Sequence, residues 1–236
     1  MKTAHQSHVG YRRENNEDNC RVIRYDDGTC LLTVADGMGG EIGGDIASAI
    51  AVESIEGAGQ PTGRDLAGHL TDRILAAHGE IRNAIDNRPE LSGMGTTLVI
   101  AYIRKGLLYW AHVGDSRLYL FRDGNLMRMT EDHTIPGRLL AAGDITEEAA
   151  EIHPMRNLLL RCVGCRRCEP DSGSFLVKPG DVVLLCSDGL YGEVSADVIA
   201  AILGERAELA DRLGMLIDAA LAGGGSDNIT VVGAEI

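Results

Sequence analysis

The stretch Cys30-Leu31-Leu32-Thr33-Val34-Ala35-Asp36-Gly37-Met38-Gly39-Gly40 joins a short apolar run to an aspartate and a series of glycines. The run has the length and composition of a buried strand, so we expect the Asp36 carboxylate at the end of that strand. An Asp-Gly pair is also common in hairpin turns. Here the pair follows mostly apolar residues and precedes further glycines, which favours a metal site over a turn.

Four further acidic clusters are spread along the chain, and two of them also follow strand-like apolar runs, while a third directly precedes such a run. Carboxylates at strand ends can gather along one edge of a sheet, and a cluster of hard oxygen ligands there is what Mg2+ or Mn2+ requires. The sequence therefore predicts a metal-dependent hydrolase. The acidic residues of these clusters are Glu17, Asp18, Asp115, Asp188 and Asp227.

The order of the apolar runs predicts an α+β fold. Two strands flank a hairpin signal at 26–28, two helices follow at 45–55 and 64–87, and a strand-rich meander over 96–129 indicates an antiparallel sheet. We therefore expect two stacked antiparallel β-sheets flanked by pairs of α-helices, a four-layer αββα sandwich. The remaining expected elements are strands at 174–178, 181–186 and 229–234, and helices at 196–203 and around 209–220.

Length and composition favour a single catalytic domain over residues 1–236, because the chain is 44% hydrophobic and has no low-complexity tract. Residues 131–170 interrupt the strand pattern with proline, glycine and a short Ala/Leu helix. We expect this segment to be a mobile flap insertion over one side of the site. Loops in such positions often determine which substrate is bound.

The formal net charge of -13 argues against nucleic acid as the main partner, because neutralising phosphates requires a basic face. The chain has no run of about 18 apolar residues. Residues 1–10 are polar and lack the apolar segment of a signal peptide. We therefore expect a soluble cytoplasmic protein that binds no membrane, with a monomer as the default state.

Three closely spaced cysteines, Cys162, Cys165 and Cys168, form a C-x-x-C-x-x-C run. The spacing is compatible with zinc or an iron-sulfur cluster, but no fourth cysteine or nearby histidine completes a ligand set. Redox sensitivity is the favoured alternative. The other cysteines lie in or beside apolar runs and are interpreted as small buried hydrophobic residues: Cys20, Cys30 and Cys186.

Six short motifs occur in a fixed order along the chain. Together they closely resemble the motifs of the metal-dependent protein serine/threonine phosphatases of type 2C, in their compact bacterial form. The resemblance covers residues from about 9 to 232, and six motifs in one order are far more specific than any of them alone. The motifs are Arg13-x-x-x-Glu17-Asp18, Asp36-Gly37-Met38-Gly39-Gly40, Gly95-Thr96-Thr97, Gly114-Asp115-Ser116-Arg117, Ser187-Asp188-Gly189 and Asp227-Asn228-Ile229-Thr230.

The resemblance implies two Mn2+ or Mg2+ ions. Asp36 would bridge both ions, and the carbonyl of Gly37 would complete one of them, since a glycine lets the backbone come close to the metal. Asp188 and Asp227 would hold one of the two ions.

The remaining acidic residues have roles implied by the same resemblance. Glu17 would bind the other ion largely through water, with Asp18 as a further candidate ligand. Asp115, together with Asp188, would form a weaker third metal site. Asn228 is expected to support the ligands without binding an ion itself.

The mechanism implied by two cations about 4 Å apart is a hydroxide formed from a shared water, which needs no side-chain base. Arg13 would grip the phosphate in a bidentate fork. It is preferred over the adjacent Arg12 because it stands five residues before Asp18, as the family's phosphate-binding arginine does. Met38 replaces the histidine of many eukaryotic relatives, so water would protonate the leaving group. Three other histidines are expected to be structural: His112, His133 and His153.

The leading hypothesis is a phosphatase that acts on phosphorylated Ser/Thr proteins and opposes a bacterial Ser/Thr kinase. A catalytically silent phosphoprotein-binding module is an alternative, disfavoured by the complete set of metal-site aspartates and Arg13. A two-metal phosphodiesterase or nuclease is another. The sequence pI of about 4.9 and the lack of a basic, aromatic-lined groove disfavour that class.

Overall fold

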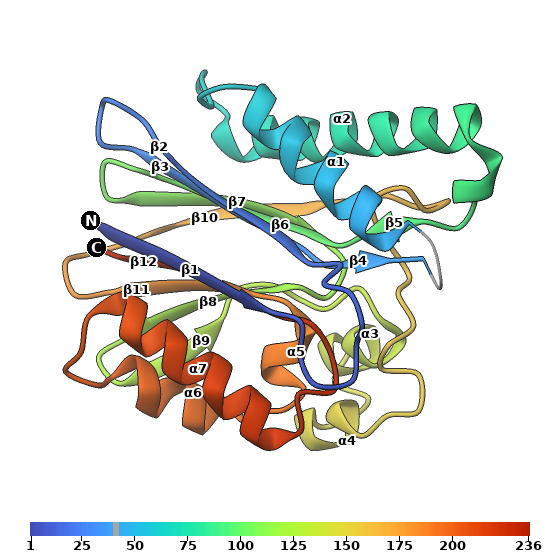
Figure 1. Cartoon of the computed structure of the whole chain (residues 1–236). Helices are drawn as coiled ribbons and strands as arrows, with labels where there is room; N and C mark the ends of the chain where they lie inside the picture. Colours follow the sequence, from blue (N-terminus) through green and yellow to red (C-terminus); the bar gives the residue numbers. More distant parts are fainter. Residues whose placement is uncertain (40–42) are drawn as a thin grey trace.

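Two five-stranded antiparallel sheets stack face to face in the computed structural model, which describes residues 1–39 and 43–236 (Figure 1). The first sheet has the strand order β1-β12-β11-β8-β9, and the second has the order β10-β7-β6-β3-β2. Strands β4 and β5 form a separate two-stranded ribbon. The strands are β1 (Lys2–His8), β2 (Asn19–Arg24), β3 (Cys30–Ala35), β4 (Gly37–Met38), β5 (Gly95–Thr96), β6 (Leu98–Arg104), β7 (Leu107–Val113), β8 (Arg117–Arg122), β9 (Asn125–Arg128), β10 (Asp171–Leu176), β11 (Val182–Cys186) and β12 (Ile229–Glu235).

Helices cover both outer faces of the stacked sheets. Helices α1 and α2 lie over the second sheet, and α6 and α7 lie over the first (Figure 1). The shorter α3, α4 and α5 lie near the end of the sandwich where β4 and β5 are found. The helices are α1 (Gly44–Gly57), α2 (Leu66–Asn87), α3 (Ile135–Ala141), α4 (Glu147–Glu151), α5 (Asp188–Tyr191), α6 (Ala196–Leu203) and α7 (Leu209–Gly223), with a short 3-10 helix at Pro89–Leu91.

Three apolar clusters fill the spaces between the four layers, and β3 shows how one strand serves two of them. Leu31 and Ala35 pack with the helices α1 and α2, whereas Leu32 and Val34 pack between the two sheets. A strand buried on both faces needs apolar residues at nearly every position, which explains the continuous apolar run. The expected αββα sandwich is confirmed.

Most elements of the first third form where the sequence predicts them. Strands β2 and β3 pair around the turn at 25–29, in which Tyr25 N–H donates to the carbonyl of Thr29 at 3.0 Å. Helix α2 begins after Asp65, whose carboxylate accepts from the N–H of Gly68 at 2.9 Å and caps the helix. Its apolar positions recur every three or four residues and face the core.

The prediction that the 96–129 meander forms one sheet is wrong. Strand β6 pairs with β7 in the second sheet, but β8 pairs with β9 and β11 in the first. The chain crosses between the sheets at Gly114, where φ is 106° and a Cβ atom would lie 2.6 Å from Cγ2 of Thr97. Glycine satisfies both constraints. A crossing and a hairpin both join two strands through a short turn, so local pattern does not separate them.

Strand β1 was not predicted from the sequence, and β10 lies earlier in the chain than predicted. Strand β1 is polar, so it lacks the apolar run used to recognise strands. It lies at the edge of the first sheet, where it pairs over its whole length with β12, from Lys2 opposite Glu235 to His8 opposite Ile229. Strand β10 begins three residues before the expected range 174–178 and ends two residues before the end of that range, because its register is set by pairing with β7.

The flap segment, residues 131–170, carries α3 and α4 and is closed at its base. The N–H of Leu160 donates to the carbonyl of His133 at 2.7 Å, and Thr134 forms a bridge with Leu159. Thr134 also caps α3 by accepting from the N–H of Gly137 at 3.1 Å. The mobility of this segment stays a prediction.

Among the helices of the described residues, none combines the length and apolar character needed to cross a bilayer.

Candidate active site

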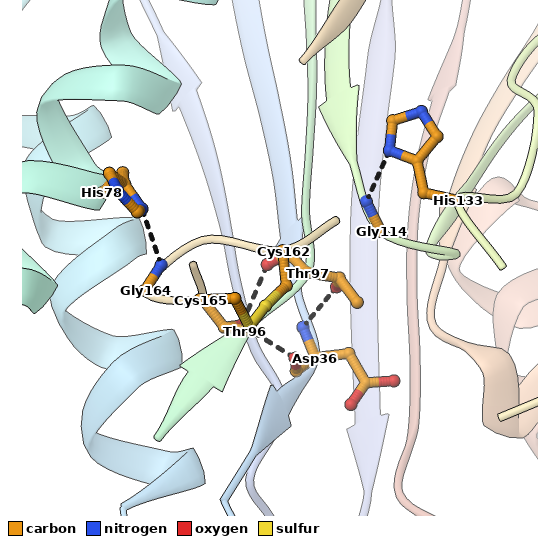
Figure 2. The surroundings of a disulfide bond; sticks show 9 residues. All are labelled: Asp36, His78, Thr96, Thr97, Gly114, His133, Cys162, Gly164 and Cys165. Carbon is orange, nitrogen blue, oxygen red and sulfur yellow. Dashed lines mark hydrogen bonds between the residues drawn. A yellow bond between two sulfur atoms is a disulfide. The ribbon is translucent and has the colours of Figure 1, made fainter. Parts of the chain in front are cut away.

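Asp36 lies directly after β3, where the chain enters the β4–β5 ribbon. Its N–H donates to Oγ1 of Thr97 at 2.9 Å, and its carbonyl accepts from the N–H of Thr97 at 2.9 Å. The hydroxyl of Thr96 donates to the same carbonyl at 2.8 Å. Two threonines therefore hold the Asp36 backbone, and the carboxylate points away from them (Figure 2).

Four aspartates from distant parts of the chain come together around this carboxylate. Burial and then repulsion from the neighbouring carboxylates raise the pKa of Asp36 well above its usual 3.8. Burial is also the main cause that raises the pKa of Asp115 well above that value, that of Asp18 to about 7 and that of Asp188 to about 6. A divalent cation would offset this concentration of negative charge. The carboxylates that repel Asp36 are Asp18, Asp188, Asp115 and Asp227.

The hydrogen bonding of the Asp18 carboxylate indicates whether these oxygen donors fit a metal ion. Its Oδ2 accepts from Oγ of Ser187 at 2.7 Å, whereas its Oδ1 is buried and has no hydrogen-bond partner among the described residues. A buried carboxylate oxygen without a partner is costly. Mg2+ and Mn2+ prefer such hard oxygen donors, so the residues present fit a divalent cation.

The carboxylates nevertheless do not form a finished ligand shell. Within residues 1–39 and 43–236, no three Asp, Glu, His or Cys side chains are arranged closely enough to hold an ion as they stand. Asp227 is instead paired with Arg13, with 2.8 Å between Oδ2 and Nη2. This pair is partly exposed and is worth at most about 1 kcal/mol, so a divalent cation would compete effectively with Arg13 for Asp227.

Asn228 joins the acidic N-terminal loop to the start of β12. Its Oδ1 accepts from the N–H of Glu17 at 2.8 Å, and its Nδ2 donates to the carbonyls of Val9 and Asn15, each at 2.9 Å. Burial raises the pKa of Glu17, whose side chain lies against Gly44 at the start of α1. The side chain of Asn228 thus holds the loop that carries Glu17.

Gly37 is required by packing between the loop and α1. A Cβ atom at this position would collide with the carbonyl oxygen of Gly44 and lie 2.6 Å from that of Glu17. The N–H of Gly37 donates to the same Glu17 carbonyl at 3.2 Å. Close approach to α1 and the loop is a sufficient reason for this glycine, without the close approach to a metal that the resemblance implies. Gly40, which ends the same motif, lies outside the described residues.

A cleft of about 540 Å3 opens beside the acidic cluster. Asp115, Asp188 and Asp227 line one part of it, and the flap lines another, so the segment predicted to influence substrate choice faces the site. Basic side chains also line the cleft. These are Arg117, Arg128 and Arg156.

Several polar residues with no predicted catalytic or metal-binding role shape the Asp115 region. Arg117 is buried, stacks on the ring of Tyr191 at 3.4 Å and forms a 2.6 Å ion pair with Asp132 of the flap. The N–H of Gly114 donates to Nδ1 of His133 at 3.1 Å (Figure 2). These contacts tie the base of the flap to the crossing turn. Their signal in the sequence was limited to the Gly114-Asp115-Ser116-Arg117 motif, because the partners are distant along the chain.

Stacked antiparallel sheets covered by helices, with carboxylates gathered beside a cleft at one end, define a four-layer αββα fold with an acidic site. The sequence profile of the protein phosphatase 2C family matches residues 6–222. The chain belongs to this family.

Two relatives and one solved structure illustrate the similarity. The serine/threonine protein phosphatase PstP of Mycobacterium tuberculosis is 38% identical over 237 residues, which are 100% of this chain and 45% of PstP, so the chain spans about half the length of that relative. The serine/threonine phosphatase stp of Listeria welshimeri is 37% identical over 94% of this chain and 91% of its own length. The catalytic domain of PstP, solved in complex with two manganese ions, is 37% identical to this chain. The match covers 99% of this chain and 97% of that domain, and the two structures superimpose with a TM-score of 0.88.

Proposed function

We propose that this chain is a metal-dependent protein serine/threonine phosphatase that hydrolyses phosphoserine and phosphothreonine in proteins. The observation that carries the proposal is the convergence of five aspartates beside a cleft, in a chain that belongs to the protein phosphatase 2C family. The two manganese ions in the PstP catalytic domain support Mn2+ or Mg2+ as the cofactor here.

The acidic residues would divide into the ligand sets that the family resemblance implies. Asp36 would bridge two ions with help from the Gly37 carbonyl, Asp188 and Asp227 would hold one of them, and Glu17 would serve the other. Asp18, with its unpartnered Oδ1, is a further ligand, and Asp115 with Asp188 would hold a third ion. When bound, the ions supply an activated water molecule and neutralise charge on the phosphate.

Arg13 would bind the phosphate oxygens. Its guanidinium already lies within 2.8 Å of Asp227, at the edge of the acidic cluster, and its side chain is about half exposed. A planar guanidinium that can exchange a carboxylate for a phosphate provides a bidentate contact and stabilises charge in the transition state. Arg12 is exposed, and the ion pairs of the described residues do not include it.

Met38 occupies the position directly after the Asp-Gly pair and offers no proton. The leaving Ser or Thr alkoxide would therefore take its proton from solvent. His133 is not suited to this step, because its Nδ1 accepts from Gly114 and its Nε2 contacts Asp171 at 2.9 Å.

The decisive experiment compares a phosphothreonine peptide with bis-p-nitrophenyl phosphate, a phosphodiester, with added Mn2+ and with excess chelator. We expect Mn2+-dependent hydrolysis of the peptide, resistance to okadaic-acid-type inhibitors and little activity on the diester. Preferential hydrolysis of the diester would support a phosphodiesterase instead. Peptide binding without turnover would support a silent phosphoprotein-binding module, and full activity in chelator would refute the metal assignment.

The wider biological context follows from the same proposal. The substrates would be phosphorylated Ser/Thr proteins, among them a cognate Ser/Thr kinase and its targets. We propose a monomeric, cytoplasmic single domain over residues 1–236. Phosphoproteins that accumulate when the gene is deleted would identify the substrates, and light scattering of the purified protein would test the monomer.

A further inference from the structure

A disulfide joins Cys162 to Cys165 at the end of the flap, beside the ribbon that follows Asp36 (Figure 2). Their Cα atoms are 5.4 Å apart, a separation typical of disulfides. Cys168 has the same spacing from Cys165 as Cys162 has, yet it remains a free thiol and packs against the core under α1 and α2. The fold therefore selects one of two equivalent pairings in the C-x-x-C-x-x-C run.

The disulfide encloses a residue that contacts the Asp36 support. Val163, between the two cysteines, exchanges two backbone hydrogen bonds with Thr96: its carbonyl accepts at 3.0 Å and its N–H donates at 2.9 Å. Thr96 in turn donates its hydroxyl to the carbonyl of Asp36. A single residue therefore links the disulfide-bonded segment to the backbone of the bridging aspartate.

The segment 162–165 also contacts helix α2. The N–H of Gly164 donates to Nδ1 of His78 at 3.0 Å, and φ at Gly164 is 87°. A Cβ atom there would lie 2.6 Å from Cγ2 of Ile81, so the segment lies very close to the helix. On the ribbon side, Sγ of Cys165 and Cε of Met38 both lie next to the α-carbon of Gly95.

The four cysteines outside the bond are poorly reactive thiols. Burial raises the pKa of Cys20, Cys30 and Cys168 to about 11 and that of Cys186 to about 12, so these thiols stay protonated and react poorly. Cys162 is buried, whereas Cys165 is partly exposed and is therefore the more accessible member of the pair.

We propose that the Cys162–Cys165 pair is a reversible redox switch that holds the end of the flap in the conformation in which Val163 pairs with Thr96, in the ribbon that follows Asp36. What the switch would control, metal binding and phosphatase activity, rests on the function proposed above. The contacts of Val163 and Gly164 are those of the oxidised form. Reduction removes the covalent constraint on these two residues. The hydrogen bonds between Val163 and Thr96 must then offset the larger conformational entropy of the open segment by themselves.

The oxidant is a low-molecular-weight disulfide such as oxidised glutathione. The Cys165 thiolate attacks one sulfur of that disulfide, forms a mixed disulfide and expels one small thiolate. The Cys162 thiol then loses its proton and attacks the Cys165 sulfur, expelling the second small thiolate. One disulfide is broken and one is formed. Two protein thiols are oxidised, and their protons end on the two small thiols.

The test equilibrates the full-length protein with excess oxidised or reduced glutathione and counts free cysteines by alkylation and mass spectrometry. In the wild type and in Cys168→Ser, we expect oxidation to protect two cysteines, mapped to residues 162 and 165, and reduction to release them. Cys162→Ser should show no stable intramolecular bond. If all six wild-type cysteines stay alkylatable in excess oxidised glutathione, or if Cys168 is one of the protected pair, the proposal is overturned.

Hydrogen exchange of the Val163 and Thr96 amides tests the mechanical link in the same samples. We expect exchange at least about five-fold slower in the oxidised wild type than in the reduced one, the lower end of typical coupling between sites. Cys168→Ser should show the same difference. Equal exchange in both forms would overturn the switch even if the disulfide forms. Neither readout requires phosphoester hydrolysis, so failure of the proposed enzymatic function would leave both results interpretable. The Mn2+ concentration needed for half-maximal activity then shows whether the redox state affects metal binding. We expect this concentration to be higher after reduction.

Discussion

Asp36 is a single residue held in two ways: two threonines fix its backbone, and its carboxylate lies among four other carboxylates. Its place at a strand end was visible in the sequence. The identity of the threonines that hold it follows from pairing between β4 and β5, which lie nearly 60 residues apart along the chain.

Asp36→Asn and Asp188→Asn should each remove most of the Mn2+-dependent phosphatase activity. The amide keeps the size of the side chain but removes a negative ligand, and metal activation contributes several kcal/mol to such reactions, so we expect a loss of about 100-fold or more in kcat. Circular dichroism and thermal melting in chelator should show a folded protein. Near-normal turnover by a folded Asp36→Asn protein would remove this residue from the metal site.

Arg13→Ala should mainly raise KM for a phosphopeptide. A charge-assisted hydrogen bond is worth about 1.5–3 kcal/mol, which corresponds to a roughly 10- to 150-fold change. The adjacent Arg12→Ala is the matched control, because it removes the same charge from an exposed position. Steady-state kinetics on both variants would decide between them, and a larger effect at Arg12 would transfer the role to that residue.

At the scale of elements, the site depends on contacts between segments far apart in sequence. Asn228 connects the start of β12 with the loop before β2, and Arg117 connects β8 with the flap. Periodicity located most strands and helices to within a few residues. It did not reveal β1, because an edge strand made of polar residues is stabilised by backbone pairing and presents no apolar run.

Asn228→Ala should loosen the N-terminal acidic loop. The variant loses three hydrogen bonds to backbone groups, so we expect a decrease of roughly 1–3 kcal/mol in the free energy of unfolding. Because Asn228 holds Glu17 in place, the Mn2+ requirement should rise by about 10- to 100-fold, as for other residues that orient ligands.

The control for this variant is Asn125→Ala, whose exposed side chain donates to the carbonyl of Asp123 in the β8–β9 turn. Chemical denaturation and Mn2+ titration of both proteins provide the comparison. Equal effects at both positions would show that Asn228 has no special connection with the site.

At the scale of the whole molecule, folding concentrates acidic groups that the unfolded chain keeps apart. Burial raises the pKa of Asp18 to about 7 and that of Asp188 to about 6, from an ordinary 3.8. The folded state therefore binds these protons more tightly than the unfolded chain does. The stability they contribute is fully present below the ordinary pKa and is lost as pH rises through the raised values.

In chelator, the melting temperature should consequently fall between about pH 5 and about pH 8. Saturating Mn2+ should reduce this fall, because a cation that binds the folded state takes over the role of the protons and stabilises by mass action. Thermal melting at both pH values, with chelator and with Mn2+, measures the effect. Asp18→Asn should flatten the slope in chelator. A melting temperature that rises over this range in the wild type would contradict the linkage.

The sequence by itself determined the family, the αββα class and the set of acidic residues, because these depend on local apolar runs and on the order of short motifs. The tertiary structure decided that β7 and β8 belong to different sheets, that Arg13 pairs with Asp227, and that Cys162 bonds to Cys165 and not to Cys168. Each of these outcomes depends on which distant segments pack together. Spacing along the chain does not determine that choice. A hairpin and a crossing both use a short turn after β7, and Cys165 is equally far from Cys162 and Cys168 in the sequence.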